Sequence, residues 1–171
     1  MLTVDPNHTN QNPELTNYPD ILEVRLNKNR TSRLYTRKAF NKDEVIISMK
    51  NGYYTDKSYQ TVQISEQDHV YDKDIIYLNH SCDPSVNLKV YKTADGKPVL
   101  ELIASRDLKV DDELTFFYPS TEWDMDEPFD CWCQSSRCKK SIRGAKYHTS
   151  EELEGYFVNG YIQDLLKAAN N

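Results

Sequence analysis

The cysteine pattern is the feature that most limits how this chain can fold. The chain has four cysteines, and three of them lie within eight residues: Cys82, Cys131, Cys133 and Cys138. Three thiols so close together cannot all pair with one distant partner, which disfavours a simple disulfide framework. Four thiolates do form a complete ligand set for one tetrahedral Zn²⁺. We therefore predict one structural zinc ion, which would fold the cysteine-rich segment back over the middle of the chain.

The alternatives for these cysteines are four reduced structural thiols, or one disulfide with two free thiols. The compartment bears on this choice, because disulfides are rare inside cells. The N-terminal residues show no basic and then apolar signal pattern, and no apolar run approaches the roughly 20 residues of a membrane span. These absences predict an intracellular protein without membrane contact, and they do not distinguish cytoplasm from nucleus.

Length and charge limit the architecture and the partners. The chain has 171 residues, which suits one hydrophobic core. Its formal charge is −6, whereas nucleic-acid-binding proteins normally present a basic face. We therefore expect no direct nucleic-acid binding, and the charge is compatible with a basic partner such as a lysine-rich peptide.

Alternating apolar and polar residues predict a mainly β fold of several short strands. The expected strands are 21–26, 32–36, 44–48, 61–64, 86–91, 99–103 and 114–118. Residues 1–20 are polar and proline-containing, which predicts a flexible lead-in. Only residues 148–171 show a clear helical pattern, with a start at Ser150 and an interruption at Asn159-Gly160.

Three motifs then occur in a familiar order. The segment Asn79-His80-Ser81-Cys82-Asp83-Pro84-Ser85 resembles the Asn-His-Ser-Cys-x-Pro-Asn signature of SET-domain protein lysine methyltransferases, with Ser85 in place of the last Asn. Residues 112–118, Asp-Glu-Leu-Thr-Phe-Phe-Tyr, resemble the second signature, Gly-Glu-Glu-Leu-Thr-x-Asp-Tyr. Residues 131–138, Cys-x-Cys-x4-Cys, resemble the post-SET zinc motif. The resemblance implies a SET domain at 21–120, a post-SET zinc segment at 121–147 and a C-terminal helix at 148–171.

The resemblance also implies roles, position by position. Tyr118 matches the catalytic tyrosine, and Cys82 matches the zinc ligand that the SET body contributes. The positions implied for S-adenosylmethionine are Arg33, Leu34, Tyr35, Asn79 and His80. The positions implied for the substrate lysine channel are Phe116, Trp132 and Ile142. In this sequence the family's Gly-x-Gly motif is replaced by Thr31-Ser32-Arg33, so backbone groups of residues 33–35 would have to hold the cofactor.

These matches predict transfer of methyl groups from S-adenosylmethionine to lysine in a protein or peptide. The attacking amine must be neutral, although a free lysine has a pKa of about 10.4. An apolar channel and the positive sulfonium both favour loss of the proton, and the sequence offers no obvious general base. Phenylalanine at 116 leaves room for a methylated amine, which predicts di- or trimethylation. The alternative is a non-catalytic SET-like, zinc-stabilised module that binds a basic peptide.

Overall fold

The computed structural model describes residues 15–26 and 31–169. The strands are β1 (Leu22–Leu26), β2 (Ser32–Thr36), β3 (Val45–Met49), β4 (Tyr53–Thr55), β5 (Val62–Gln63), β6 (His69–Tyr71), β7 (Asn79–His80), β8 (Val86–Lys92), β9 (Pro98–Ala104), β10 (Glu113–Phe116), β11 (Phe129–Asp130) and β12 (Ser141–Ile142). The helices are the short 3-10 segments η2 (Ile75–Tyr77), η3 (Tyr118–Ser120) and η4 (Ala145–Tyr147), and the α-helix α1 (Gly160–Ala169).

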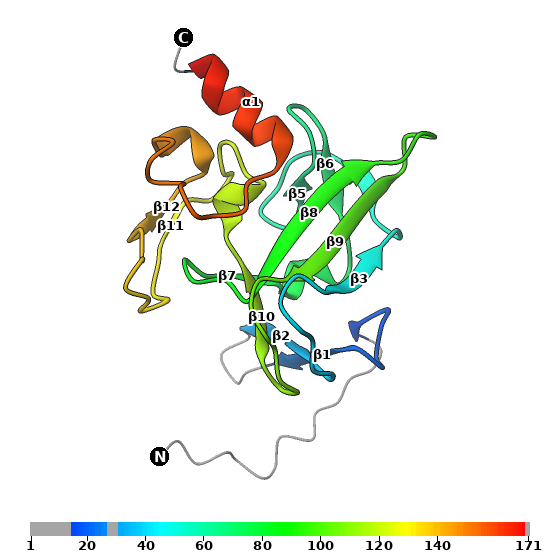
Figure 1. Ribbon diagram of the computed structural model, residues 1–171. Coiled ribbons are helices and arrows are strands. Elements are labelled where there is room, and N and C mark those ends of the chain that lie inside the picture. Colours follow the sequence, from blue (N-terminus) through cyan, green and yellow to red (C-terminus); the bar gives the residue numbers. More distant parts are fainter. Residues whose placement is uncertain (1–14, 27–30, 170–171) are drawn as a thin grey trace.

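Within these described residues the strands form four small sheets. One has the order β1-β2-β10-β7, in which β10 and β7 are parallel and the other neighbours antiparallel. The others are β3-β9-β8, β4-β6-β5 and the ribbon β11-β12, all antiparallel. Figure 1 shows β1 and β2 at one end of the molecule, α1 at the opposite end, and β8 and β9 between them.

The alternation in the sequence explains which faces are buried. Along β8 the side chains of Val86, Leu88 and Val90 point into the core, while Lys89 between them is exposed. The same period of two buries Leu114 and Phe116 on β10. The main core joins these strands to the sheets beside them. A second cluster gathers α1, η4 and the cysteine-rich segment around the buried Ile162, so the C-terminal part has its own apolar centre.

The α-helix begins later in the chain than the sequence pattern predicts. The hydrogen bonds of a capping box are present at Thr149, because its backbone N–H donates to the Glu152 carboxylate (2.9 Å) and the Glu152 N–H donates to the Thr149 hydroxyl (3.2 Å). The chain nevertheless forms only turns over 151–155, because Gly155 takes a positive φ of 77° and ends the segment. The α-helix begins at Gly160. It has 10 residues, and no helix in the described ranges has the length and apolar character of a bilayer span.

Part of the expected N-terminal lead-in is packed against the body. Thr16 is buried, and its hydroxyl donates to the Asp74 carboxylate. The Asn17 side chain donates to the other oxygen of Asp74 at 2.9 Å. Polar side chains in residues 15–20 therefore form hydrogen bonds with a buried carboxylate, and their polarity does not indicate flexibility. Residues 1–14 lie outside the described residues.

A buried asparagine closes the outer edge of β8. The Asn159 side chain accepts from the backbone N–H of Val90 (3.0 Å) and donates to the carbonyls of Leu88 (2.9 Å) and Ser120 (3.0 Å). An unpaired edge strand exposes such groups, so this one side chain satisfies two of them on β8 and also bonds the carbonyl of Ser120 in η3. It also fixes the start of α1 against β8 and η3.

We expect Asn159→Ala to lower the free energy of unfolding by about 3 kcal/mol, because the N–H of Val90 and the carbonyl of Leu88 lose their side-chain partner. The Ser120 carbonyl keeps the backbone N–H of residue 159 as a donor. Urea denaturation followed by fluorescence measures this change. The same substitution at the exposed Asn51 is the control and should cost less than about 0.5 kcal/mol. Equal midpoints for the two variants would contradict the role given to Asn159.

Candidate functional site

The candidate site is a cleft of about 440 Å³ between the loop before β5 and the segment before β11. Its volume is within the range usual for ligand pockets. The lining is contributed by four parts of the chain: residues 58–62, residues 75–80, the end of β10 with η3, and residues 125–129. Among the residues predicted from the sequence, Asn79, His80, Phe116 and Tyr118 line this cleft.

Tyr118 lies where β10 ends and η3 begins. The sequence predicted that the strand continues to this residue, but β10 ends at Phe116 and Pro119 is in the first turn of η3. The Tyr118 hydroxyl donates to the carbonyl of Leu78 at 3.1 Å, which leaves its oxygen free to accept a hydrogen bond. Burial, and secondarily the charge of Glu122, raise the pKa of Tyr118 to about 12. The hydroxyl is therefore protonated at neutral pH.

Aromatic rings surround Tyr118. The Phe116 ring, only 3% exposed, is 4.7 Å from the Tyr118 ring between centroids. The rings of His80 and Phe129 meet it edge-on, with centroid distances of 5.2 and 5.9 Å. Such a set offers π faces to a cation. This arrangement suits a lysine ammonium or a methylated amine.

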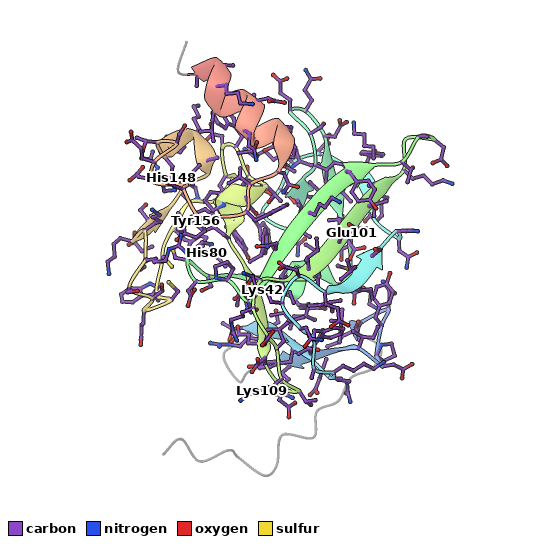
Figure 2. The ribbon with its side chains drawn as sticks, in the orientation of Figure 1. Lys42, His80, Glu101, Lys109, His148 and Tyr156 are labelled. Carbon is purple, nitrogen blue, oxygen red and sulfur yellow. The ribbon has the colours of Figure 1, made fainter. Side chains whose placement is uncertain are left out.

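His80 connects the cleft to the cysteines. Its Nδ1 accepts from the backbone N–H of Tyr118 (3.2 Å), so the ring proton is assigned to Nε2, which lies 3.2 Å from the sulfur of Cys82. Burial, and then the nearby His148, lower the pKa of His80 to about 3, so the ring is neutral. Figure 2 shows His80, Tyr156 and His148 along the side of the molecule that carries β11 and β12.

Asn79 and the residues of β2 are neighbours, but only Asn79 lines the cleft. Its side-chain amide donates to the carbonyl of Ser32 at 2.7 Å. The side chain of Leu34 is fully buried in the core, and Arg33 pairs with Glu113 at 2.6 Å. The Tyr35 ring stacks under the guanidinium of Arg25 at 4.1 Å. The side chains at 33–35 are therefore directed elsewhere, and what β2 offers beside Asn79 is backbone.

The four cysteine sulfurs meet in one cluster. The Sγ atoms of Cys82, Cys131, Cys133 and Cys138 all lie within 4.8 Å of one another, and those of Cys82 and Cys131 are 3.9 Å apart. In a tetrahedral zinc–thiolate site, Zn–S bonds of about 2.3 Å place the sulfurs about 3.8 Å apart. The backbone N–H of Lys139 also donates to Cys82 Sγ at 3.3 Å, as expected for a thiolate. Ligand number, type and spacing therefore fit one zinc ion.

The two remaining channel residues do not lie in the cleft. Trp132 is 85% exposed, and Ile142 is fully buried in the second core cluster. Ile142 pairs across the β11-β12 ribbon with Phe129, and it is Phe129 that lines the cleft. The ribbon thus carries both Ile142, which the resemblance implies for the channel, and Phe129, which it does not. Phe129 lies two residues before Cys131, and this closeness to a predicted zinc ligand was the sequence feature that could have identified it.

Sequence reasoning also missed a carboxylate. Glu122 is 9% exposed and lines the same cleft, four residues after Tyr118. Its Oε1 accepts from the backbone N–H of Gln63 (2.9 Å) and lies 3.3 Å from the Thr121 hydroxyl. Burial raises its pKa to about 7, and these hydrogen bonds oppose the shift. Glu122 stands in an acidic stretch with Asp124, Asp126 and Glu127, and the sequence alone does not show that it is the buried residue of this stretch.

Comparison with known proteins agrees with this geometry. The family model described as SET domain matches residues 9–119. The protein named Methyltransferase flvH, of Aspergillus flavus, is 44% identical over 54% of this chain and 49% of its own length. A histone-lysine N-methyltransferase of Emericella nidulans, H3 lysine-4 specific, is 41% identical over 37% of this chain and 5% of its own length. The chain thus spans half or less of these curated relatives.

Two solved structures share the fold. One is KRYPTONITE in complex with mCHH DNA, an H3(1-15) peptide and SAH, with a TM-score of 0.53 at 17% identity over 70% of this chain and 29% of that one. The other is the methyltransferase domain of human SETMAR, with a TM-score of 0.51 at 15% identity over 72% of this chain and 58% of that one. Together with the family model, which covers more than half of the sequence, these findings show that the chain belongs to the SET-domain family.

Proposed function

We propose that this protein transfers methyl groups from S-adenosylmethionine to the side-chain amine of lysine in a protein or peptide. The observation that carries the proposal is the buried Tyr118 hydroxyl, which is held by the Leu78 carbonyl and enclosed by aromatic rings in an open cleft. A pure binding module has no need of a polar group oriented at the base of an apolar cage. Membership of the SET-domain family supports the same reaction class.

The cofactor would supply an electrophilic methyl group on a sulfonium. Asn79 and His80, together with the backbone carbonyl of Ser32, are the groups of this chain that we propose for holding it. His80 also belongs to the set of rings around Tyr118, so the cofactor and the amine would meet beside it. Glycine is absent at 31–33, so the cofactor must approach a backbone that carries side chains.

The residues around Tyr118 would orient the amine. Its hydroxyl oxygen can accept one N–H of the amine, and the rings of Phe116 and Phe129 limit where the chain of the lysine can lie. Fixing the amine in line with the methyl group turns an encounter of two molecules into one oriented step.

The outer cleft supports a basic substrate. Asp126 and Glu127 are exposed on one wall, and residues 58–60, with the exposed Tyr59, form the facing loop. A negative rim attracts a lysine-rich peptide, as does the net charge of −6. We therefore propose a basic peptide segment, of the kind found in histone tails, as the substrate class.

We further propose that one zinc ion binds Cys82, Cys131, Cys133 and Cys138, and that the segment 121–147 closes the cleft of the domain at 21–120. The cluster geometry and the path of the chain support this arrangement, because residues 125–129 lead from the cleft wall directly into the cysteines.

A methylation assay tests the proposed reaction. Zinc-loaded protein is incubated with methyl-labelled S-adenosylmethionine and a pool of lysine-rich peptides, and cofactor binding is measured separately by calorimetric titration. Labelled peptide, with cofactor binding that Asn79→Ala removes, is the expected result. Binding of peptide without cofactor binding or transfer would favour the alternative, a zinc-stabilised module that only binds basic peptides.

Phe116 is expected to set how many methyl groups are added. Its buried ring places no hydroxyl next to the Tyr118 ring, so we propose that the wild-type protein di- or trimethylates. Phe116→Tyr adds a hydroxyl, or a bound water, in this space and should shift the product towards monomethyl-lysine with activity retained. Mass spectrometry at long incubation measures the distribution. A purely monomethyl product from the wild-type protein would count against the proposal.

A further inference from the structure

Burying the carboxyl group of Glu122 costs more free energy than burying a neutral side chain that makes the same contacts. Its Oε1 holds two neighbours, the N–H of Gln63 and the hydroxyl of Thr121. A glutamine oxygen could accept the same two hydrogen bonds without the penalty of burying a charge. A glutamate at this position therefore indicates a use for its charge or for its proton.

The carboxylate also lacks a resident cation. Among the described residues, no lysine, arginine or histidine lies within 4.0 Å of it, and Lys57 acts on it only through space. Buried carboxylates are normally paired with a cation. Glu122 lines the cleft, so a cation that enters the cleft can reach it.

Its backbone is held in place relative to Tyr118. The Glu122 N–H donates to the Tyr118 carbonyl at 3.0 Å, one turn back along η3, and its own carbonyl accepts from the N–H of Ala145 at 2.8 Å. On the side of α1, the Tyr161 hydroxyl lies 2.7 Å from the Gln63 carbonyl and 2.6 Å from that of Thr121. The carboxylate is thus presented to the cleft on a braced wall, which is a requirement for a catalytic group.

We propose that Glu122 is the general base of this enzyme and accepts the proton that the target lysine ammonium must lose. This step rests on the proposed methyl transfer. An N–H bond of the ammonium breaks and an O–H bond forms on Glu122. The freed nitrogen lone pair attacks the methyl carbon of the sulfonium, and the C–S electron pair remains on sulfur. The proton then passes from Glu122 through the open cleft to water.

The groups facing Glu122 define what else can titrate there. Tyr118 on η3 and Tyr161 on α1 both have pKa values raised by burial and then by Glu122, so both are neutral near pH 7. On β6, the pKa of His69 is lowered by burial and by Lys57, and that of His80 on β7 is near 3. The remaining charges in or near the cleft are Lys57, Asp126 and Glu127. Glu122, with a pKa of about 7, is the group suited to proton transfer at neutral pH.

The test is the pH profile of kcat/KM for the zinc-loaded wild-type protein and for Glu122→Gln. The substrate is an unmethylated peptide that the methylation assay has shown to accept methyl groups. The base must be ionised, so wild-type kcat/KM should rise through about pH 7 and then level. The variant depends on lysine that has already lost its proton, so its value should keep rising towards about pH 10. We expect a loss of about 100-fold at pH 7.5 that shrinks strongly by pH 10.

A stability measurement and a control variant distinguish a catalytic role of Glu122 from a purely structural one. Glu122→Gln keeps the hydrogen bonds and removes a buried charge, so its unfolding temperature at pH 8 should equal or exceed that of wild type, with unchanged cofactor binding. Glu66→Gln, the same change at an exposed position, is the control and should keep the wild-type profile. A Glu122→Gln profile identical to wild type would overturn the base while leaving methyl transfer intact. Absence of transfer by the wild-type protein would refute the proposed function itself. If the variant fails to fold, a wild-type profile with no inflection below pH 9 would also exclude Glu122.

Discussion

Tyr118→Phe should slow methyl transfer by about 100- to 1000-fold, the usual cost of removing one oriented polar group from an active site. The phenylalanine ring keeps the contacts with Phe116 and Phe129, so the cage remains. What disappears is the oxygen that can accept from the amine, together with the hydrogen bond to the Leu78 carbonyl. Turnover of labelled methyl groups into peptide measures the effect.

Two controls make this prediction specific. Cofactor affinity and zinc content should be unchanged, because the variant retains both contacts with His80, the backbone N–H and the edge of the ring. Tyr53→Phe, an exposed tyrosine on β4, should keep full activity. A Tyr118→Phe protein as active as wild type would remove Tyr118 from the mechanism and leave positioning to the rings alone.

Loss of one cysteine should have the largest effect on the C-terminal part of the fold. Cys82→Ser is expected to abolish stoichiometric zinc binding, because the fully buried Cys82 is the one ligand that joins the cluster to the body of the domain. Structural zinc sites contribute apparent free energies of about 10–16 kcal/mol, so the segment 125–142 should lose its fixed structure. Zinc content by atomic spectroscopy and protease sensitivity of this segment are the measurements.

Activity should fall together with the metal. Residues 125–129 line the cleft and precede the cysteines directly, and a strong chelator should therefore abolish methyl transfer by the wild-type protein as it removes zinc. Trp132→Ala is the matched control, because this exposed side chain lies between two ligands and should not affect zinc content. A chelated protein with an intact protease pattern would show that the four thiols hold the segment without metal.

The longer strands could be predicted because each has one buried face. Alternation placed β8 and β9 within one or two residues, since their core side chains recur every second position. The strands β7, β11 and β12 have only two residues each, too few for any period to be visible. They are held by neighbours distant in sequence, as when β7 lies parallel to β10. The prediction of a mainly β fold with a C-terminal helix is therefore confirmed, whereas the two-residue strands β7, β11 and β12 were not predicted.

The candidate site was predictable where a motif marks it and not where packing creates it. Motif matching brought Tyr118, Asn79 and the four cysteines to attention, and the structure places the first two in the cleft and the sulfurs in one cluster. Glu122 and Phe129 carry no motif. Their place in the cleft depends on the contact of Glu122 with β5 and on the β11-β12 ribbon, which only the folded chain shows.

The contacts of Tyr161 have a consequence for how the protein matures during synthesis. Its hydroxyl reaches the carbonyl of Gln63, which lies 98 residues earlier in the chain. Ribosomes add about 5–20 residues per second, so Gln63 waits roughly 5–20 s for this partner after it has been made. During that interval the cleft wall is unbraced and its carboxylate is open to solvent. Competence for methyl transfer should thus arise late, as α1 docks, and a purified chain truncated before residue 160 should bind zinc but remain inactive.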